Sequence, residues 1–268
     1  MAKQWVKTEL KSEFDELESL MREAKTAGKA VLLSNDGGGM AGLFPLVCAD
    51  EMETRLDGPL CDYVTMVVGR SIGAAGATMI MHAQKKGEGP AKARTLLFDH
   101  LTQVFKVRKD KNGQDSKFFG QYDISPITGP GGALVEALGI GDDDMLPDPT
   151  PYDVNEGSGS QTPFCFLITA TASRQNGVYQ PKLLSNFKLG NNHHWSAHVM
   201  RSWPVRIAIQ ASTAAPDYFL PVDHGGKEYL DGAVAANNPT ELMILIFLEL
   251  VKAEPTKLSD IVASGLRD

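Results

Sequence analysis

Three consecutive glycines, Gly37 to Gly39, follow a short apolar run in the stretch VLLSNDGGGMAGLFP, residues 31–45. Each glycine loses much backbone entropy when it becomes ordered, so a run of three needs a physical reason. Without side chains, successive backbone N–H groups can point into one concavity and approach a bound oxygen, helped by the N-terminus of a following helix. A phosphate-binding loop is the competing explanation, but the chain has no GxxxxGKS or GxxxxGKT spacing.

A second glycine-bearing turn lies at Gly69 to Gly73, where GRSIG is the chain's only Gly-x-Ser-x-Gly motif. It follows the β-branched strand candidate CDYVTMVVG, residues 61–69, and runs into SIGAAGATMIMHAQKK, whose alanines and methionines predict a helix. A serine at such a junction forms a nucleophile elbow, in which its hydroxyl stands above the edge of a sheet. Ser71 is therefore a candidate nucleophile, flanked by the elbow glycines Gly69 and Gly73, although an ordinary glycine-rich turn would carry the same residues.

Strand, tight turn and helix in succession indicate an α/β fold, and 268 residues suit one domain with a sizeable core. Ahead of it, residues 5–26 are predicted to form an amphipathic helix that ends at Gly28. The apolar stripe of this helix consists of Leu10, Phe14, Leu17, Met21 and Ala24. We expect residues 1–29 to be a helix packed on a domain that spans residues 30–268.

Further regular segments are predicted along the rest of the chain. They are a strand at 163–172, a segment of unassigned type at 205–213, a hairpin at 224–239 that opens a helix from Pro239, and a last strand at 257–266. The middle, residues 85–160, is rich in glycine, proline and charge and is expected to consist largely of loops.

The formal net charge of -7 provides no broad positive surface for nucleic acid or an anionic membrane.

Cys48, Cys61 and Cys165 lie in or beside apolar runs without CxxC spacing and are expected to be reduced, buried thiols. The charged N-terminus does not look like a secretory signal, so we expect a cytoplasmic protein. The apolar run at 242–248 is far shorter than the ~20 residues needed to cross a bilayer and is expected to be a buried helix.

A serine that attacks an ester needs a base to accept its proton and donors to hold the oxyanion that forms. Asp231 in YLDGAVAANNP is the favoured base, because it ends a short strand before a glycine turn. His82 and His100, on predicted helices, are alternatives. His194 and His198 have the i, i+4 spacing of metal ligands, but no third ligand stands at a diagnostic spacing, so a packing or surface role is favoured.

Four motifs, DGGGMAG, GRSIG, ASTAAPDYF and DGAVAANNP, stand in an order that resembles the signatures of the patatin-like phospholipase family. The resemblance runs from about residue 31 to 249 and is looser in the middle. It implies a three-layer α/β/α fold with a mainly parallel central sheet. It also implies that Ser71 is the nucleophile, that Asp231 is the base of a Ser-Asp dyad, and that the amides of Gly37, Gly38 and Gly39 form the oxyanion hole.

By the same resemblance, the substrate is a fatty acyl ester of a phospholipid, galactolipid or neutral glyceride, and neither a metal nor another cofactor is needed. Contact with a membrane surface would be transient. A carboxylate is a poor proton acceptor unless it is positioned and partly desolvated, so the oxyanion hole has to compensate.

Two arginines that are usual in the family are missing, because Ala41 and Gln210 stand in their places. Conversely, Arg70 precedes the nucleophile. Its side chain can serve the site electrostatically or point away along the strand, and the divergence of adjacent side chains at a turn favours the second.

The hypothesis is therefore a cytoplasmic lipid acyl hydrolase that works through an acyl-enzyme. One alternative is a weak or inactive relative that binds lipid or a partner, motivated by Ala41 and Gln210. Another is a Ser-His-Asp esterase, in which a late histidine, His224, would be essential.

Overall fold

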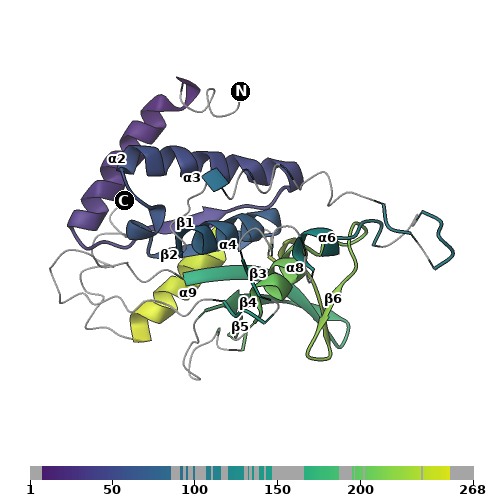
Figure 1. Cartoon of the computed structure of the whole chain (residues 1–268). Helices are drawn as coiled ribbons and strands as arrows, with labels where there is room; N and C mark the ends of the chain where they lie inside the picture. The colour runs from purple at the N-terminus through teal and green to yellow at the C-terminus, as the bar shows by residue number, and fades with distance from the viewer. Residues whose placement is uncertain are drawn as a thin grey trace.

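A computed structural model gives the fold of the chain (Figure 1). It describes residues 8–85, 107–109, 111–115, 120–129, 139–141, 143–146, 166–186, 197–201, 203–236 and 238–253, with single residues or pairs at 91–92, 95, 99, 132, 135 and 195. The first elements are α2 (Lys11–Thr26), β1 (Leu32–Asn35), η1 (Gly39–Gly42), α3 (Leu43–Leu56), η2 (Leu60–Asp62), β2 (Met66–Arg70) and α4 (Ile72–Lys85). The later elements are α6 (Ser125–Thr128), β3 (Phe166–Gln175), β4 (Val178–Ser185), β5 (Val199–Met200), α8 (Val205–Thr213), β6 (Val222–His224), β7 (Lys227–Asp231), η3 (Gly232–Val234) and α9 (Pro239–Ala253).

The order of strands and helices confirms the predicted α/β organisation around both glycine turns. β1 leads through the glycine run into η1 and α3, and β2 leads directly into α4. The segment of unassigned type at 205–213 is the helix α8, and α9 begins at Pro239 as predicted. The predicted last strand and most of the loop-rich middle lie outside the described residues.

The strands form one mixed sheet in the order β1-β2-β3-β4-β5, with β7 pairing both β3 and β6. β1, β2 and β3 are mutually parallel, as are β4 and β5, whereas β3–β4, β3–β7 and β6–β7 are antiparallel. The expectation of a mainly parallel sheet is therefore wrong for the described strands. The physical reason is the two-residue turns at 176–177 and 225–226, whose positive φ values suit tight hairpins, and a hairpin can join only antiparallel strands.

Helices cover both faces of β1 and β2. Val67 points into a core shared with α3, α4 and α8, whereas its neighbours Met66 and Val68 pack against α9. Figure 1 shows the same arrangement, with α2 and α3 on one side of these strands and the yellow α9 on the other. The alternation of side chains along β2 thus places an apolar core on each face, and the strand ends are left for the site.

The N-terminal helix packs on the domain through part of the predicted stripe. Phe14 and Met21 are buried, whereas Leu17 is 42% exposed. The Arg55 guanidinium of α3 lies over the Phe14 ring and forms a salt bridge with Asp15. The helix α2 spans Lys11–Thr26 and ends just before Gly28, which has a positive φ of 64°. Thr8 and Glu9 ahead of it are also helical, and the predicted start at residue 5 lies outside the described residues.

The apolar run at 242–248 belongs to α9, which is buried on one side only. Leu242, Met243 and Ile246 lie in the core, while Ile244 and Leu245 are 45% and 38% exposed. No helix within the described ranges is both long and apolar enough to cross a membrane.

Candidate active site

Ser71 lies at the sharp junction between β2 and α4. Its φ is +55°, a left-handed value that is uncommon for a residue with a side chain and typical of a nucleophile elbow. Its backbone N–H donates a hydrogen bond to Oγ of Ser212 in α8, with an N···O distance of 3.1 Å. Its carbonyl accepts hydrogen bonds from the first turn of α4. The turn thus holds the serine backbone from two helices.

The two glycines of the GRSIG motif are required by close packing of the backbone. A β-carbon at position 73 would lie 2.4 Å from the carbonyl oxygen of Asn35, and one at position 69 would lie 2.5 Å from the α-carbon of Ala74. Real β-carbons do not approach other atoms so closely. Gly69 therefore lets β2 pack closely against the first turn of α4, and Gly73 lets the elbow pack closely against the end of β1.

Asp231 is the last residue of β7 and is 2% exposed. Its Oδ1 accepts a hydrogen bond from the N–H of Ala233, with an N···O distance of 2.8 Å, and the Ser71 side chain interacts with its carboxylate in the sense that lowers the carboxyl pKa. The N–H of Asp231 donates to the carbonyl of Ala214, just after α8. Pairing with Thr171 of β3 fixes the register of Asp231 in the sheet. The chain thus brings Ser71 and Asp231 together from strands that are far apart in the sequence.

Burial raises the pKa of Asp231, because desolvation disfavours the charged form. The hydrogen bond from Ala233, the interaction with the Ser71 side chain and the positive charge of Arg70 act in the opposite direction. A buried carboxylate with a raised pKa is a stronger proton acceptor than one in water. This environment suits a general base next to a hydroxyl.

The glycine run lies directly against the elbow. A β-carbon at Gly37 would come within 2.8 Å of the β-carbon of Ser71. Gly38 and Gly39 have φ values of 149° and 56°, which favour glycine over residues with side chains. The backbone of this loop can therefore reach the immediate surroundings of the Ser71 side chain.

Arg70 also lies at the glycine loop, so the expectation that its side chain points away is wrong. Its guanidinium carbon, Cζ, is 3.5 Å from the place that a Gly37 β-carbon would occupy. The divergence of adjacent side chains at the turn does not separate Arg70 from the site, because the bare backbone of Gly37 leaves room for both Arg70 and Ser71.

The comparison with known protein families agrees with this geometry. The model of the patatin-like phospholipase family matches residues 33–244, a range that includes the glycine loop, the elbow and Asp231. The chain belongs to this family. It is also 27% identical over 228 residues to Patatin-like protein 2 of Arabidopsis thaliana, an alignment that covers 80% of this chain and 51% of that protein. The patatin-like chain thus spans about half the length of this relative.

The described histidines lie in packing positions within the patatin-like domain. His224 pairs with Lys227 at the end of β7 opposite to Asp231, and its ring contacts Trp203 with a centroid distance of 4.3 Å. Nδ1 of His198 is 2.8 Å from the carbonyl oxygen of Pro181. The side chains of His82, His100 and His194 lie outside the described residues, and so does the side chain of Ala41.

Two supporting residues of the patatin-like site were missed by the sequence analysis. Ser212 holds the backbone of Ser71, and the buried Thr171 donates hydrogen bonds to the carbonyls of Ala211 and Leu230. Ser212 lies in the motif ASTAAPDYF, which is the signal that could have identified it. Thr171 has no local signal, because its role depends on the pairing of β3 with β7.

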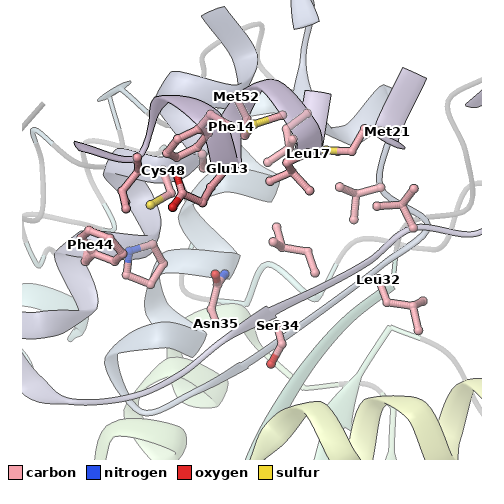
Figure 2. A pocket seen from close by; sticks show the side chains of 17 residues that line it. Glu13, Phe14, Leu17, Met21, Leu32, Ser34, Asn35, Phe44, Cys48 and Met52 are labelled. Atoms are coloured by element: carbon pink, nitrogen blue, oxygen red, sulfur yellow. The ribbon is translucent and has the colours of Figure 1, made fainter. Parts of the chain in front are cut away.

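An apolar cavity of about 430 Å³ adjoins the glycine loop, between α2, α3 and β1 (Figure 2). Its lining includes Phe14 and Met21 of α2 and Cys48 and Met52 of α3. Cys48 is a free thiol only partly buried, and its burial raises its pKa. Asn35, two residues before Gly37, is one of its lining residues. Figure 2 shows the Asn35 amide directed toward the cavity, and its Nδ2 has no hydrogen-bond partner within the described part of the chain.

Proposed function

We propose that the chain is a serine esterase that hydrolyses fatty acyl esters of lipids through a dyad of Ser71 and Asp231. The observation that carries this proposal is the interaction of the Ser71 side chain, at its left-handed turn, with the buried Asp231 carboxylate next to the glycine loop. Membership of the patatin-like phospholipase family supports the choice of a lipid acyl ester as substrate.

In the first half of the proposed reaction, Asp231 accepts the Ser71 proton while Oγ attacks the ester carbonyl carbon. The tetrahedral intermediate collapses when the C–O bond to the lipid alcohol breaks, and the proton on Asp231 passes to that alcohol. An acyl-enzyme remains. In the second half, Asp231 accepts a proton from water, the hydroxide attacks the acyl carbon, and Ser71 leaves with the proton as the free fatty acid is released.

The N–H groups of Gly37, Gly38 and Gly39 are proposed to hold the oxyanion that forms in each half. The closeness of Gly37 to Ser71 and the positive φ values of Gly38 and Gly39 support this assignment. Fixed backbone donors stabilise the developing charge without reorganising, and the loss of one donor typically costs about 2.7–4 kcal/mol in other serine hydrolases. Stabilisation of the transition state by this amount offsets the conformational entropy that three adjacent glycines lose on ordering.

The wider patatin-like architecture belongs to the same proposal. Helices on both faces of β1 and β2 support a three-layer arrangement of helices, sheet and helices. We also propose that residues 1–29 act as a packed appendage of a domain at 30–268, and that the protein meets its lipid substrates from the cytoplasm by transient contact with a membrane surface.

The test compares ester hydrolysis by the wild type with that by Ser71→Ala and Asp231→Asn. We expect Ser71→Ala to fall to background and Asp231→Asn to lose roughly 100- to 10,000-fold, the usual contribution of a general base. His224→Ala is the matched control and should keep its activity, because His224 of β6 pairs with Lys227, at the opposite end of β7 from Asp231. Wild-type turnover by either dyad variant would refute the dyad.

Labelling with a fluorophosphonate separates an active enzyme from an inactive lipid-binding relative. The probe should modify the wild type at Ser71 and leave Ser71→Ala unmodified. No labelling of the folded wild type would favour the inactive relative. Products formed from a mixed lipid extract, identified by mass spectrometry, would then define the headgroup and the acyl position.

A further inference from the structure

We propose that Arg70 is a positioning residue for the glycine loop, whose guanidinium keeps Gly37 seated against Ser71 and supplies positive charge to the dyad. This inference rests on the proposed function, because it assigns a role within the same site. It concerns a residue inside the GRSIG motif that takes no part in the proton transfers above.

The contacts of Gly37 support a positioning role. Three atoms surround the place where its β-carbon would be, namely Cβ of Ser71 at 2.8 Å, the carbonyl oxygen of Arg70 at 3.0 Å and Cζ of Arg70 at 3.5 Å. Arg70 therefore meets the glycine loop with both its backbone and its guanidinium. A loop that consists of glycines has many accessible conformations, so a planar, charged side chain against it restricts the loop to the one that faces Ser71.

The charges around Asp231 identify Arg70 as the cation that acts on the dyad. On its own strand, Lys227 and Glu228 are exposed at the opposite end. On β3, the uncharged Thr171 stands opposite Asp231. Lys182 of β4 lies beyond Thr171, and its Nζ donates to the carbonyl of Ala197 at 2.8 Å.

Among the described residues, the other elements packed near Asp231 bring no competing cation to it. The only charged residue of α8 is Arg206, near its first residue, whereas Asp231 is bonded to Ala214 after its last turn. The turn η3 is uncharged, and the titratable Tyr229 is directed to the sulfur of Met200. Asp36, which precedes the glycine loop, is exposed. The positive charge of Arg70 thus favours the ionised form of Asp231, which a general base requires.

The same charge assists the reaction at a second point. When Ser71 attacks, negative charge develops on the substrate oxygen beside the loop amides. The Arg70 guanidinium, which lies on the same side of Gly37 as Ser71, stabilises that charge at short range. Arg70 acts through the loop and through Asp231, so its removal should weaken the transition state more than the binding of substrate.

The experiment compares Arg70→Met, which keeps an unbranched side chain but removes the guanidinium and its charge, with Arg70→Lys, which keeps the charge. Arg22→Met is the matched control, because it removes a positive charge from the exposed face of α2. We expect Arg70→Met to lose at least about tenfold in kcat with little change in KM, less than the roughly 100- to 1,000-fold loss that follows removal of a direct oxyanion donor. Arg70→Lys should recover part of this loss, and Arg22→Met should resemble the wild type.

The pH profile separates a charge role from simple packing. In Arg70→Met, the acid limb of kcat against pH should move to higher pH, whereas Arg70→Lys should keep the wild-type limb. A carboxyl-carbon NMR titration of Asp231 should show the same upward movement in Arg70→Met without any substrate. If both the limb and the titration stay at their wild-type positions in a folded Arg70→Met protein, the inference is wrong. The titration needs no turnover, so this result is distinguishable from failure of the proposed function. That failure would instead appear as a folded wild type that the fluorophosphonate does not label.

Discussion

Gly37 lies so close to Ser71 that a β-carbon at position 37 would come within 2.8 Å of the Ser71 β-carbon. An added methyl group therefore has to push the loop away from the elbow. We expect Gly37→Ala to reduce kcat by roughly 100- to 1,000-fold, the size of effect known for the loss of one oxyanion donor. Steady-state hydrolysis of a short-chain ester measures this loss.

The control for this substitution is Gly58→Ala, because no atom lies within 4 Å of the β-carbon that it adds. We expect Gly58→Ala to keep full activity. Circular dichroism should show both variants folded, so that the activity of Gly37→Ala reports on the loop. A Gly37→Ala protein that turns over like Gly58→Ala would show that the loop does not serve the reaction.

Asp231→Asn is expected to stabilise the fold at neutral pH. Burial raises the pKa of Asp231, so the native state holds its proton to higher pH than the unfolded state does. Stability is therefore lost as the pH rises from the unfolded pKa through the folded one, and the loss persists above that window. A neutral asparagine avoids this loss and can still accept the hydrogen bond from Ala233.

The measurement is the difference in free energy of unfolding between Asp231→Asn and the wild type as a function of pH. The difference should favour the variant near neutral pH and shrink as the pH falls below the unfolded pKa of an aspartate. The comparison of two proteins cancels the other titrating groups. A difference that moves the other way with pH would mean that Asp231 is stabilised in its charged form.

The local part of the fold could be predicted from the sequence, because strand, glycine turn and helix are encoded by neighbouring residues. The elbow at Ser71 and the start of α9 at Pro239 are examples of this kind. The mixed sheet was missed, since it depends on which strands meet, and the hairpin turns at 176–177 and 225–226 decide that. The position of Arg70 along its strand likewise did not reveal the direction of its side chain. The guanidinium lies beside Gly37, a residue of another segment whose missing side chain leaves room for it.

In the candidate site, too, features encoded by neighbouring residues could be predicted, whereas features that depend on contacts between distant segments could not. Ser71 and Asp231 could be proposed from their turns, whereas Thr171 and Ser212 support the site through pairings between distant segments. Ser212 has a local signal, the motif ASTAAPDYF, whereas Thr171 has none. Sequence motifs thus identify the reacting groups more readily than the residues that hold them.

Two glycines in α4 should respond to alanine in opposite ways. A β-carbon at Gly73 would lie 2.4 Å from the carbonyl oxygen of Asn35, whereas one at Gly76 would lie 3.5 Å from Cδ2 of Leu46, an ordinary contact. We expect Gly76→Ala to stabilise the protein by about 0.5–1 kcal/mol through helix propensity. Gly73→Ala should destabilise it by about 1–3 kcal/mol, as overpacking does.

Urea unfolding of the two variants checks this pair, with the slope of the transition confirming that each unfolds as the wild type does. The prediction is contradicted if Gly73→Ala is as stable as Gly76→Ala. Such a result would mean that the elbow does not press against the end of β1.

The last prediction concerns the packing of α2 on the domain. Phe14 is 5% exposed and contacts the core, the cavity and the Arg55 guanidinium, whereas Leu20 on the same helix is 54% exposed. We expect Phe14→Ala to lower the free energy of unfolding by about 3 kcal/mol, the low end for a buried phenylalanine, because its ring already borders a cavity. Leu20→Ala should change it by less than about 0.5 kcal/mol. Chemical denaturation measures both values, and equal effects would mean that this helix does not dock through the Phe14 face.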